Sequence, residues 1–488
     1  MNLNKKLAVA VSGAVLLMAG QFALADSTTD IVDALVSKGV LTEEEGKLIT
    51  KGAKSKSEAD AKANKARVNV GSFIDNAQLY GDMRARYERR DGKGNSSGST
   101  DSDTLEVNRS RYKFTLGVKT ESGDWYSDIA FAASPKGTSD NVTFGAAPIA
   151  VGTGLDGKGS TAYDKGHQVY VKRAQVGYKP FEWLSVEAGR MANPLYSVNA
   201  MVFDKDIVFE GLQEKLKYKF GETEVFANLA QWITSGNYSD LNGVSLSNAS
   251  TVLAYQAGAS MPLVDKKSSA KGAISFYQYG GTGGGVNGSA FTPFLGSSTN
   301  TVRAGITASS GASYGVNDLD ILDIPAEFNY MFSDTMGMKL YGEYANNLSG
   351  TDRYNKACAL SGNLVCGKGD DHDAWLLGIV VGSASDLKSL EGGKLKKGQW
   401  NANLWYQSVG AYALDPNSVD SDIFDGRVNM EGTSLKAAYM ATDGVALKFT
   451  GAWGSRKNNL LGAGGSGGDI ALNLKDYTLY QFDVEYKF

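Results

Sequence analysis

The sequence has few of the residues on which many enzymes and disulfide-rich secreted proteins depend. It contains 2 cysteines, 2 histidines and 8 prolines among 488 residues. So few cysteines exclude a disulfide-rich scaffold. No H-E-x-x-H zinc motif occurs, and the pattern G-x-S-x-G is found only within Gly- and Ser-rich predicted loops, at 94–98, 311–315 and 464–468. His167 and His372 both fall in predicted loops as well. The sequence therefore predicts neither an enzyme nor a bound metal or other cofactor.

Beyond its first 25 residues, the chain lacks the run of about 20 apolar residues that a membrane-spanning helix requires. Residues 1–25 read MNLNKKLAVAVSGAVLLMAGQFALA, in which two lysines precede an apolar core and Ala23, Leu24 and Ala25 fit an A-x-A cleavage site. This pattern predicts a secretory signal peptide. The exported chain is then either soluble or crosses a membrane with β-strands.

The chain also lacks the excess of basic residues that nucleic-acid-binding proteins carry. Its 49 Lys and Arg against 53 Asp and Glu give a net charge of −4. Removal of the signal peptide with its two lysines gives (49 − 2) − 53 = −6. This mild acidity argues against nucleic acid as a partner.

Glycine, aromatic residues and strict alternation are what the sequence has in abundance. Gly occurs 59 times, Tyr 24 times and Phe 19 times, and the chain ends YTLYQFDVEYKF. There, Val484, Tyr486 and Phe488 lie on the apolar side of an extended strand, whereas Asp483 and Glu485 lie on the polar side. One such strand also fits a soluble sandwich, but after a signal peptide it favours a barrel that is apolar outside and polar inside. Phe488, with Tyr486 and Val484, also resembles the signal that the barrel-assembly machinery reads.

The same alternating unit repeats from residue 73 to residue 488. Strands are joined alternately by short turns and by longer loops rich in Gly, Ser, Asn and Asp, which is typical of outer-membrane barrels with periplasmic turns. We therefore predict an all-β membrane protein, a 16-stranded antiparallel transmembrane β-barrel whose last strand closes against its first. The predicted strands are 76–90, 105–120, 125–134, 168–179, 184–191, 207–220, 224–233, 251–261, 270–279, 321–332, 338–346, 373–382, 399–409, 429–441, 446–455 and 477–488.

Residues 26–72 differ from the rest of the chain. Their apolar residues recur at helical spacing, Gly39 marks a helix end, and Thr42 with Glu45 forms a capping box. The pattern predicts a short helical, coiled-coil-like segment in the periplasm before the barrel domain of 73–488. Its role stays open between a solvated arm, an oligomerisation element and a tether to the cell wall.

Two stretches resemble outer-membrane porins of Gram-negative bacteria. The first is 169–220, with the G-R-M-x-N-P turn that begins at Gly189 and the F-E-G-L strand start at Phe209; the second is DALVSKGVLTEEEGKLI near the N-terminus. The resemblance implies a porin in the cell outer membrane, in contact with lipid and lipopolysaccharide and associated as a homotrimer. It also implies passive diffusion of small hydrophilic solutes and ions through the barrel.

Alternation along the predicted strands assigns charged side chains to the lumen. Opposed basic and acidic walls would create a field that favours small charged or dipolar solutes; the alternative is scattered charges at no common height. The pattern fails at Glu214, which falls among outward apolar residues, so a β-bulge or a pore-edge position is expected there. The basic set is Arg84, Arg86, Arg109, Arg111, Lys113 and Arg173, and the acidic set is Glu327, Glu343 and Asp483.

Sixteen strands leave an open aqueous channel, so a constriction requires a loop folded into the lumen. The connection 192–206 is the preferred candidate and offers Asn193, Asn199, Asp204 and Lys205. The longer connection 135–167, rich in Gly and Ala, is the competitor.

Two other stretches lie in predicted outer loops. Cys358 and Cys366 lie eight residues apart, and an oxidising compartment favours a disulfide between them. The acidic stretch 415–425, DPNSVDSDIFD, is expected to be solvated. Calcium binding is the alternative, although the glycine and glutamate of a standard calcium loop are missing.

The leading hypothesis is therefore a porin that forms a water-filled channel for passive diffusion. The second is a structural or adhesive surface barrel with a plugged lumen, which binds partners through its outer loops or its periplasmic helical arm. Electrical conductance distinguishes the two.

Overall fold

The computed structural model describes twelve stretches of the chain. They are 74–95, 101–134, 141–143, 168–237, 245–263, 267–280, 318–360, 366–387, 395–416, 418–463, 469–470 and 473–488. The predicted signal peptide and helical segment, 1–72, and most of the competing loop 135–167 lie outside these residues.

One antiparallel sheet of 17 strands contains every described strand. Because β4 has only 2 residues, the wall consists of the other sixteen. The strands are β1 (Asn76–Asn95), β2 (Asp103–Ser122), β3 (Trp125–Ser134), β4 (Val142–Thr143), β5 (Gln168–Phe181), β6 (Leu184–Ala192), β7 (Val208–Phe220), β8 (Thr223–Asn237), β9 (Ser245–Pro262), β10 (Ser268–Gly280), β11 (Asp320–Met331), β12 (Met336–Asn347), β13 (Asp373–Ser383), β14 (Trp400–Val409), β15 (Met430–Met440), β16 (Val445–Arg456) and β17 (Asn473–Lys487).

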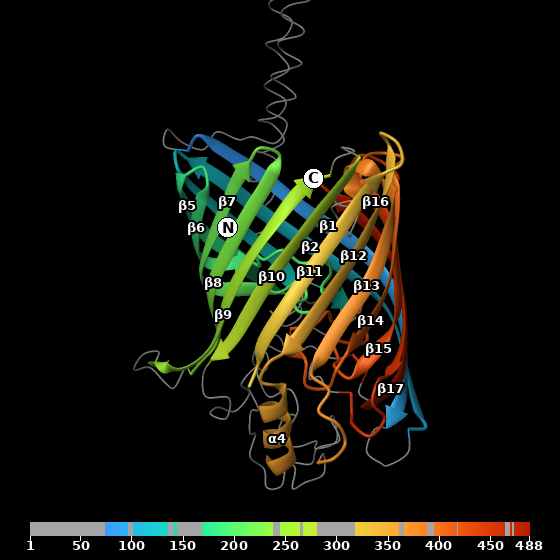
Figure 1. The fold of residues 1–488 in the computed structure, drawn as a ribbon. Coiled ribbons are helices and arrows are strands. Elements are labelled where there is room, and N and C mark those ends of the chain that lie inside the picture. The colour runs from blue at the N-terminus through green and yellow to red at the C-terminus, as the bar shows by residue number, and fades with distance from the viewer. Residues whose placement is uncertain are drawn as a thin grey trace, which may run out of the picture. The chain divides into compact units, whose positions relative to one another are not determined.

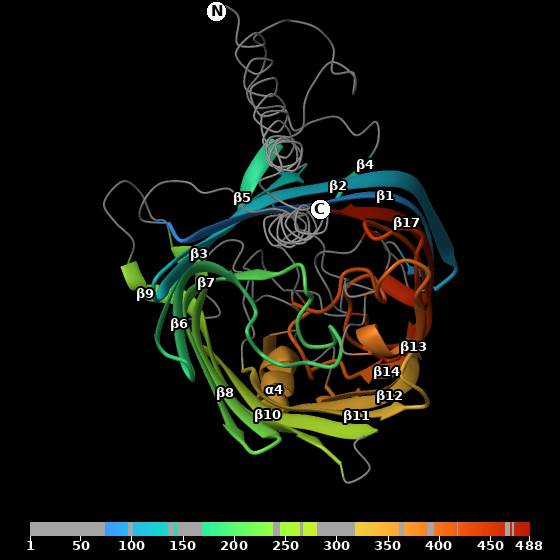
Figure 2. The ribbon, with the colours of Figure 1, turned by 90° about the horizontal axis from the view of Figure 1, so that it is seen from above.

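The sheet closes on itself because the first strand pairs with both the second and the last. Gly81 and Phe488 exchange two backbone hydrogen bonds, of 3.0 and 3.1 Å, and the β1–β17 register continues from Asp82 opposite Lys487. Figures 1 and 2 show the resulting barrel from the side and from above. A closed sheet leaves no strand edge unpaired, as lipid requires.

Each of the sixteen predicted strands overlaps one observed strand, so the predicted fold class is confirmed. The main difference lies in length: β1 and β2 each contain 20 residues. β1 continues past Arg90 through DGKGN, where the apolar alternation has stopped. This extension of β1 pairs with β17 through backbone hydrogen bonds, and alternation of side chains in the sequence does not predict such pairing.

Short and long connections alternate around most of the barrel and emerge at opposite ends (Figure 1); the exception is the 16-residue connection 384–399 between β13 and β14, which stands in the place of a short turn. Among the short turns, Gly123 and Gly221 adopt φ values of +55° and +62°, a left-handed conformation that glycine accepts at little cost. The long connections include helix α4 (Gly350–Leu360). Within the part of the chain that the structure describes, no helix is long and apolar enough to cross a membrane.

Side chains alternate between an apolar outward face and a polar inward face. In β1, Met83 and Tyr87 are outward and about half exposed, whereas Arg86 and Glu88 are inward and buried. Aromatic rings collect at the short-turn end, as in the Trp125–Tyr178 contact with a centroid distance of 4.6 Å. Polar lumen, apolar exterior and aromatic girdle are the features of a membrane barrel.

The bulge expected at Glu214 is wrong. The β6–β7 and β7–β8 registers run without a shift through this residue, opposite Val186 on one side and Leu229 on the other. Glu214 therefore faces outward, like Leu212 and Leu216, and the sheet does not rearrange to hide it.

Two glycines allow β6 and β7 to pack closely against their neighbours. Gly189 and Gly211 lie opposite each other, with φ values of +121° and +152°. A Cβ atom on Gly211 would lie 2.0 Å from the backbone oxygen of Gln231. Only glycine at position 211 allows β7 and β8 to lie this close without displacement of a strand.

We expect Gly211→Ala to lower the free energy of unfolding in lipid by about 1–3 kcal/mol, because both the backbone conformation and the contact with Gln231 become strained. Urea titration followed by tryptophan fluorescence measures the change. Gly342→Ala is the control, since its nearest atom is 3.4 Å away. Equal stabilities of the two variants would contradict the prediction.

Candidate functional site

Within the part of the chain that the structure describes, two connections in particular fold into the barrel instead of extending from its end. We name 193–207, between β6 and β7, the first inner loop, and 410–429, between β14 and β15, the second inner loop. Figure 2 shows both inside the ring of strands, the first in green and the second in orange. Together with the charged side chains of the wall, they form the candidate site.

The first inner loop is held inside by its apolar residues. Val198 and Met201 are at most 2% exposed, although the chain between two strands is usually solvated. Phe203 packs edge-on against the rings of Trp232 and Tyr277, with centroid distances of 6.0 and 5.1 Å. The loop thus buries hydrophobic surface against the inside of the wall.

Polar side chains of the wall fix the backbone of this loop. The Tyr196 N–H donates to Oε1 of Gln256, and Nε2 of the same Gln256 donates to the Tyr196 carbonyl, both at 2.8 Å. On β12, three strands farther along the wall, the carboxylate of Glu343 lies close to the backbone N–H groups of Val198 and Asn199. The loop is therefore anchored to β9 and to β12.

The C-terminal part of the first inner loop joins the second. The Asp204 N–H donates to the Ser418 carbonyl at 2.6 Å, and the backbone and hydroxyl of Ser421 both donate to Asp204 at 3.1 Å. The hydroxyl of Ser418 donates to the Val202 carbonyl. The two loops therefore form one layer within the lumen.

Two ionisable groups of this layer have pKa values near neutrality. Burial raises the pKa of Asp204 to about 7, with a further contribution from Asp420 and Asp206. Burial lowers the pKa of Lys205 to about 7, and the charge of Lys436 adds to the effect. Lys205 is still accessible to lumen water, although protein surrounds it.

The expectation that 415–425 is a solvated outer loop is wrong. Asp415, Asp420 and Asp425 are at most 8% exposed. Asp422 forms ion pairs of 2.9 Å with both Arg86 and Arg90 of β1. Burial alone would raise the pKa of Asp422, but the two arginines hold it well below its usual range.

Countercharges from the wall explain why this acidic segment folds inward. Arg90 is 1% exposed and also reaches Asp425 at 3.4 Å, and Arg427 reaches Asp425 at 3.2 Å. Phe424, within the same segment, is fully buried. Within the described residues, no group of three or more His, Cys, Asp or Glu side chains could hold a metal ion.

Three of the predicted basic residues of β1 and β2 converge on one inward carboxylate, Glu88, whereas Arg84 lies 3.9 Å from Asp483. Glu88 is fully buried and contacts Arg109, Arg111 at 3.4 Å and Arg86 at 3.7 Å. Lys113 instead reaches Asp206 of the first inner loop at 3.4 Å. The basic wall is thus largely neutralised by acids from the wall and from both loops.

The arrangement predicted for Asp483 is wrong. It lies on β17, directly opposite Arg86 in the register with β1, and pairs with it at 2.7 Å. It therefore belongs to the basic wall instead of opposing it.

Glu327 and Glu343, on β11 and β12, lie across the barrel from β1. There Lys339 approaches Glu327 at 3.7 Å. Arg173 lies apart from the arginine cluster and pairs with Asp128 at 3.1 Å.

The predicted basic and acidic sets omit four residues of the cluster, which are Glu88, Arg90, Asp422 and Asp469, although alternation along the first strand already predicts that Glu88 faces the lumen. Glu88 and Arg90 continue the inward alternation of Arg84 and Arg86, so the sequence did carry that signal. Asp469 lies in the β16–β17 connection, and no pattern in the sequence indicates that it belongs to the cluster. Its carboxylate accepts a hydrogen bond of 3.0 Å from the Arg109 guanidinium.

Two polar cavities lie beside the first inner loop. The larger, of about 600 Å³, is lined by residues that include Tyr196, Lys217, Lys271, Glu327 and Lys339. The smaller, of about 80 Å³, has lining residues that include Arg84, Lys113, Lys205, Lys436 and Lys448. Each cavity is lined by charged side chains of the wall and by residues of the first inner loop.

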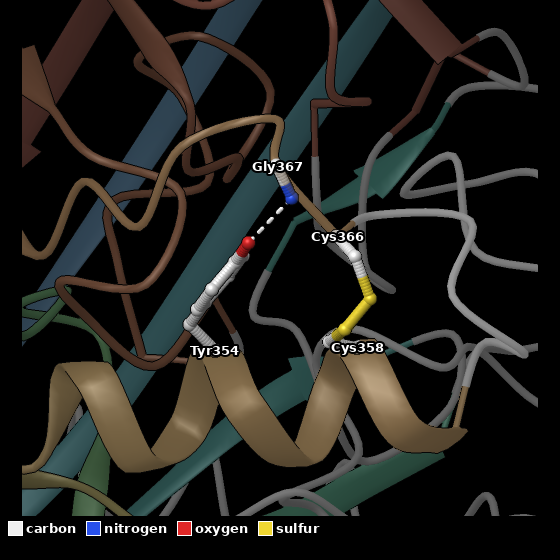
Figure 3. The surroundings of a disulfide bond; sticks show 4 residues. All are labelled: Tyr354, Cys358, Cys366 and Gly367. Atoms are coloured by element: carbon white, nitrogen blue, oxygen red, sulfur yellow. Dashed lines mark hydrogen bonds between the residues drawn. A yellow bond between two sulfur atoms is a disulfide. The ribbon is translucent and has the colours of Figure 1, made fainter.

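A disulfide joins Cys358, in α4, to Cys366, with a Cα–Cα distance of 5.0 Å (Figure 3). The Gly367 N–H that follows donates to the Tyr354 hydroxyl at 2.6 Å, and the ring of Tyr354 packs edge-on against Tyr412 of the second inner loop. The helix is thus connected to the layer inside the lumen.

Comparison with known proteins gives a family match and several solved structures. DcaP, an outer-membrane channel of Acinetobacter baumannii, is 12% identical, with 87% of this chain and 100% of that one covered and a TM-score of 0.39. OprB of Pseudomonas putida is 10% identical, with 84% and 94% covered and a TM-score of 0.44. OmpT of Vibrio cholerae is 10% identical, with 86% and 100% covered and a TM-score of 0.39.

No curated protein matches the chain. Residues 141–314 match the family model described as "Putative porin". This match includes all of 169–220, so the resemblance found in the sequence is confirmed, and over residues 141–314 the chain is similar to porins.

Proposed function

We propose that the protein is an outer-membrane channel for passive diffusion of small hydrophilic solutes and ions. The observation that carries the proposal is the anchored first inner loop, which narrows a sixteen-stranded polar lumen and leaves charged cavities beside it. A barrel of this strand number is wide enough for an aqueous path. The match to the porin family supports the same function.

Selectivity in this proposal comes from the charges around the first inner loop. Arg84, Arg111 and Lys113 on one side, and Glu327 and Glu343 on the other, would orient a dipolar solute as it passes Asn193, Asn199, Asp204 and Lys205. Ion pairs neutralise much of each wall, so the remaining field is local. A solute would exchange part of its hydration for these side chains.

The cellular context belongs to the same proposal. Residues 1–25 would direct export and be cleaved, and residues 26–72 would form the periplasmic helical segment. Val484, Tyr486 and Phe488 are outward and about half exposed at the end of β17, where the barrel-assembly machinery could bind them. The barrel would then lie among lipid and lipopolysaccharide as a homotrimer.

A second candidate function is a structural or adhesive barrel with a plugged lumen. The burial of the second inner loop favours it, because Tyr412, Leu414 and Phe424 are fully buried inside the wall. Single-channel conductance of the refolded protein in a planar bilayer decides between the two. Stable stepwise openings support the channel, whereas silence from a protein shown to be folded supports the plugged barrel.

Gln256→Leu tests the anchoring of the first inner loop. The substitution removes both hydrogen bonds to Tyr196, each worth about 1 kcal/mol, so we expect the loop to move and the unitary conductance to rise. Gln278→Leu is the matched control, because Gln278 is an outward, exposed residue of β10. A rise of the same size in both variants, or in neither, would argue against a constricting loop.

The pKa values of Asp204 and Lys205 predict a pH-dependent ion selectivity. As the pH rises through about 7, Asp204 loses a proton and becomes negative, and Lys205 loses a proton and becomes neutral. Both changes make the lumen more negative, so we expect selectivity to move towards cations between pH 6 and pH 8. Reversal potentials in a salt gradient measure the shift.

The variants Asp204→Asn and Lys205→Gln provide the check on this pH response. Each removes one of the two titrating groups, so each is expected to reduce the shift, and the double variant to abolish it. A full response in the double variant would assign the titration to other residues.

A further inference from the structure

The outward residue Glu214 lies where a membrane barrel normally has hydrocarbon. It occupies the middle of β7 (Val208–Phe220), between the outward Leu212 and Leu216. Tyr218 and Phe220, whose rings lie 4.7 Å apart, mark the aromatic girdle at the short-turn end. At about 3.3 Å per residue and a tilt of about 40°, Glu214 is about 10 Å from Tyr218, inside an apolar band about 25 Å tall.

Glu214 is part of a polar stripe, which we define as Arg190, Glu210, Glu214 and Gln231. The Gln231 side chain, on β8, contacts the Glu214 carboxylate. Nearer the long loops, Arg190 of β6 and Glu210 of β7 form an outward ion pair of 2.6 Å. Three neighbouring strands thus present charged or amide groups on their outer surface.

The opposite side of the barrel looks different. There the outward residues of β11 to β14 include many large apolar side chains, and the exposed fractions of Leu340, Leu377 and Leu404 are 42%, 64% and 47%. Around the polar stripe, the outward neighbours include the small residues Ala188 and Ala227, opposite Leu212 and Leu216. The outward face of β6–β8 therefore differs from that of β11–β14 by its charged and amide side chains.

Charged and amide side chains are costly against hydrocarbon, and membrane proteins place them against protein. We propose that the outward face of β6–β8 packs against a second copy of this chain. The inference rests on the proposed membrane location and goes beyond it by assigning the contact surface.

A second copy suits this face because copies inserted by the same route have the same orientation in the membrane. A rotation about the membrane normal keeps every residue at its own height, so polar residues of one copy face the polar residues of its neighbour at the same depth in the membrane. A Gln231 amide of one copy can then donate to a Glu214 carboxylate of the next. The small residues allow the two walls to approach closely, as they do between membrane helices.

Glu214→Leu separates a protein interface from a lipid-facing surface, because the two predict effects of opposite sign. Against a second copy, leucine removes a polar contact, and we expect at least a tenfold rise in the dissociation constant measured by native mass spectrometry in mild detergent. Against lipid, leucine replaces a charge, so the barrel would resist urea better while its association stays unchanged. That second result would overturn the proposal.

Ala188→Trp gives an independent test, with Ala326→Trp as the matched control. Both alanines face outward, on β6 and on β11 respectively, and an outward tryptophan is tolerated by lipid. We expect Ala188→Trp to yield monomers and Ala326→Trp to leave the oligomer intact. The same oligomeric state in both variants, or monomers already in the unmodified protein, would overturn the proposal.

Single-channel conductance of the same samples distinguishes failure of this inference from failure of the channel proposal. A barrel conducts through its own lumen, so monomers of Ala188→Trp still open stepwise if the protein is a channel. Silence in every variant would refute the channel and leave the association result to decide the interface alone.

Discussion

The structure depends on one constraint, which is that every backbone N–H and C=O group facing lipid must have a partner within the chain. A sheet meets it only by closing, and here the closure is the pairing of β1 with β17, completed by the two bonds between Gly81 and Phe488. Closure also fixes which side chains point into the lumen. A shift of one residue at this seam would turn Arg86 and Glu88 outward and Tyr87 inward.

The interior follows from the charges that closure places there. Arg86 and Arg90 are too deeply buried to remain without countercharges, and the second inner loop supplies Asp422 to both. The first inner loop in turn is fixed to the second through Asp204. The wall and the two inner loops are therefore held together by the same contacts. The loop residues that neutralise the arginines also occupy space in the lumen.

The strands could be predicted from the sequence because alternation and turn residues are local signals. The inward positions of Arg86 and Glu88 follow from the same period of two. The inner position of 415–425 could not be predicted, since an acidic segment looks the same whether water or a distant arginine neutralises it. Asp483 was assigned to the wrong wall even though the pairing of the last strand with the first was expected, because the residue-by-residue register of that seam is a long-range property.

The seam between β1 and β17 also sets an order of events. Arg86 and Asp483 are 397 positions apart in the chain, so the first strand made has to wait for the last before its buried arginine meets that partner. Closure of the seam, rather than any property of the early strands, therefore determines when the lumen acquires its final charge.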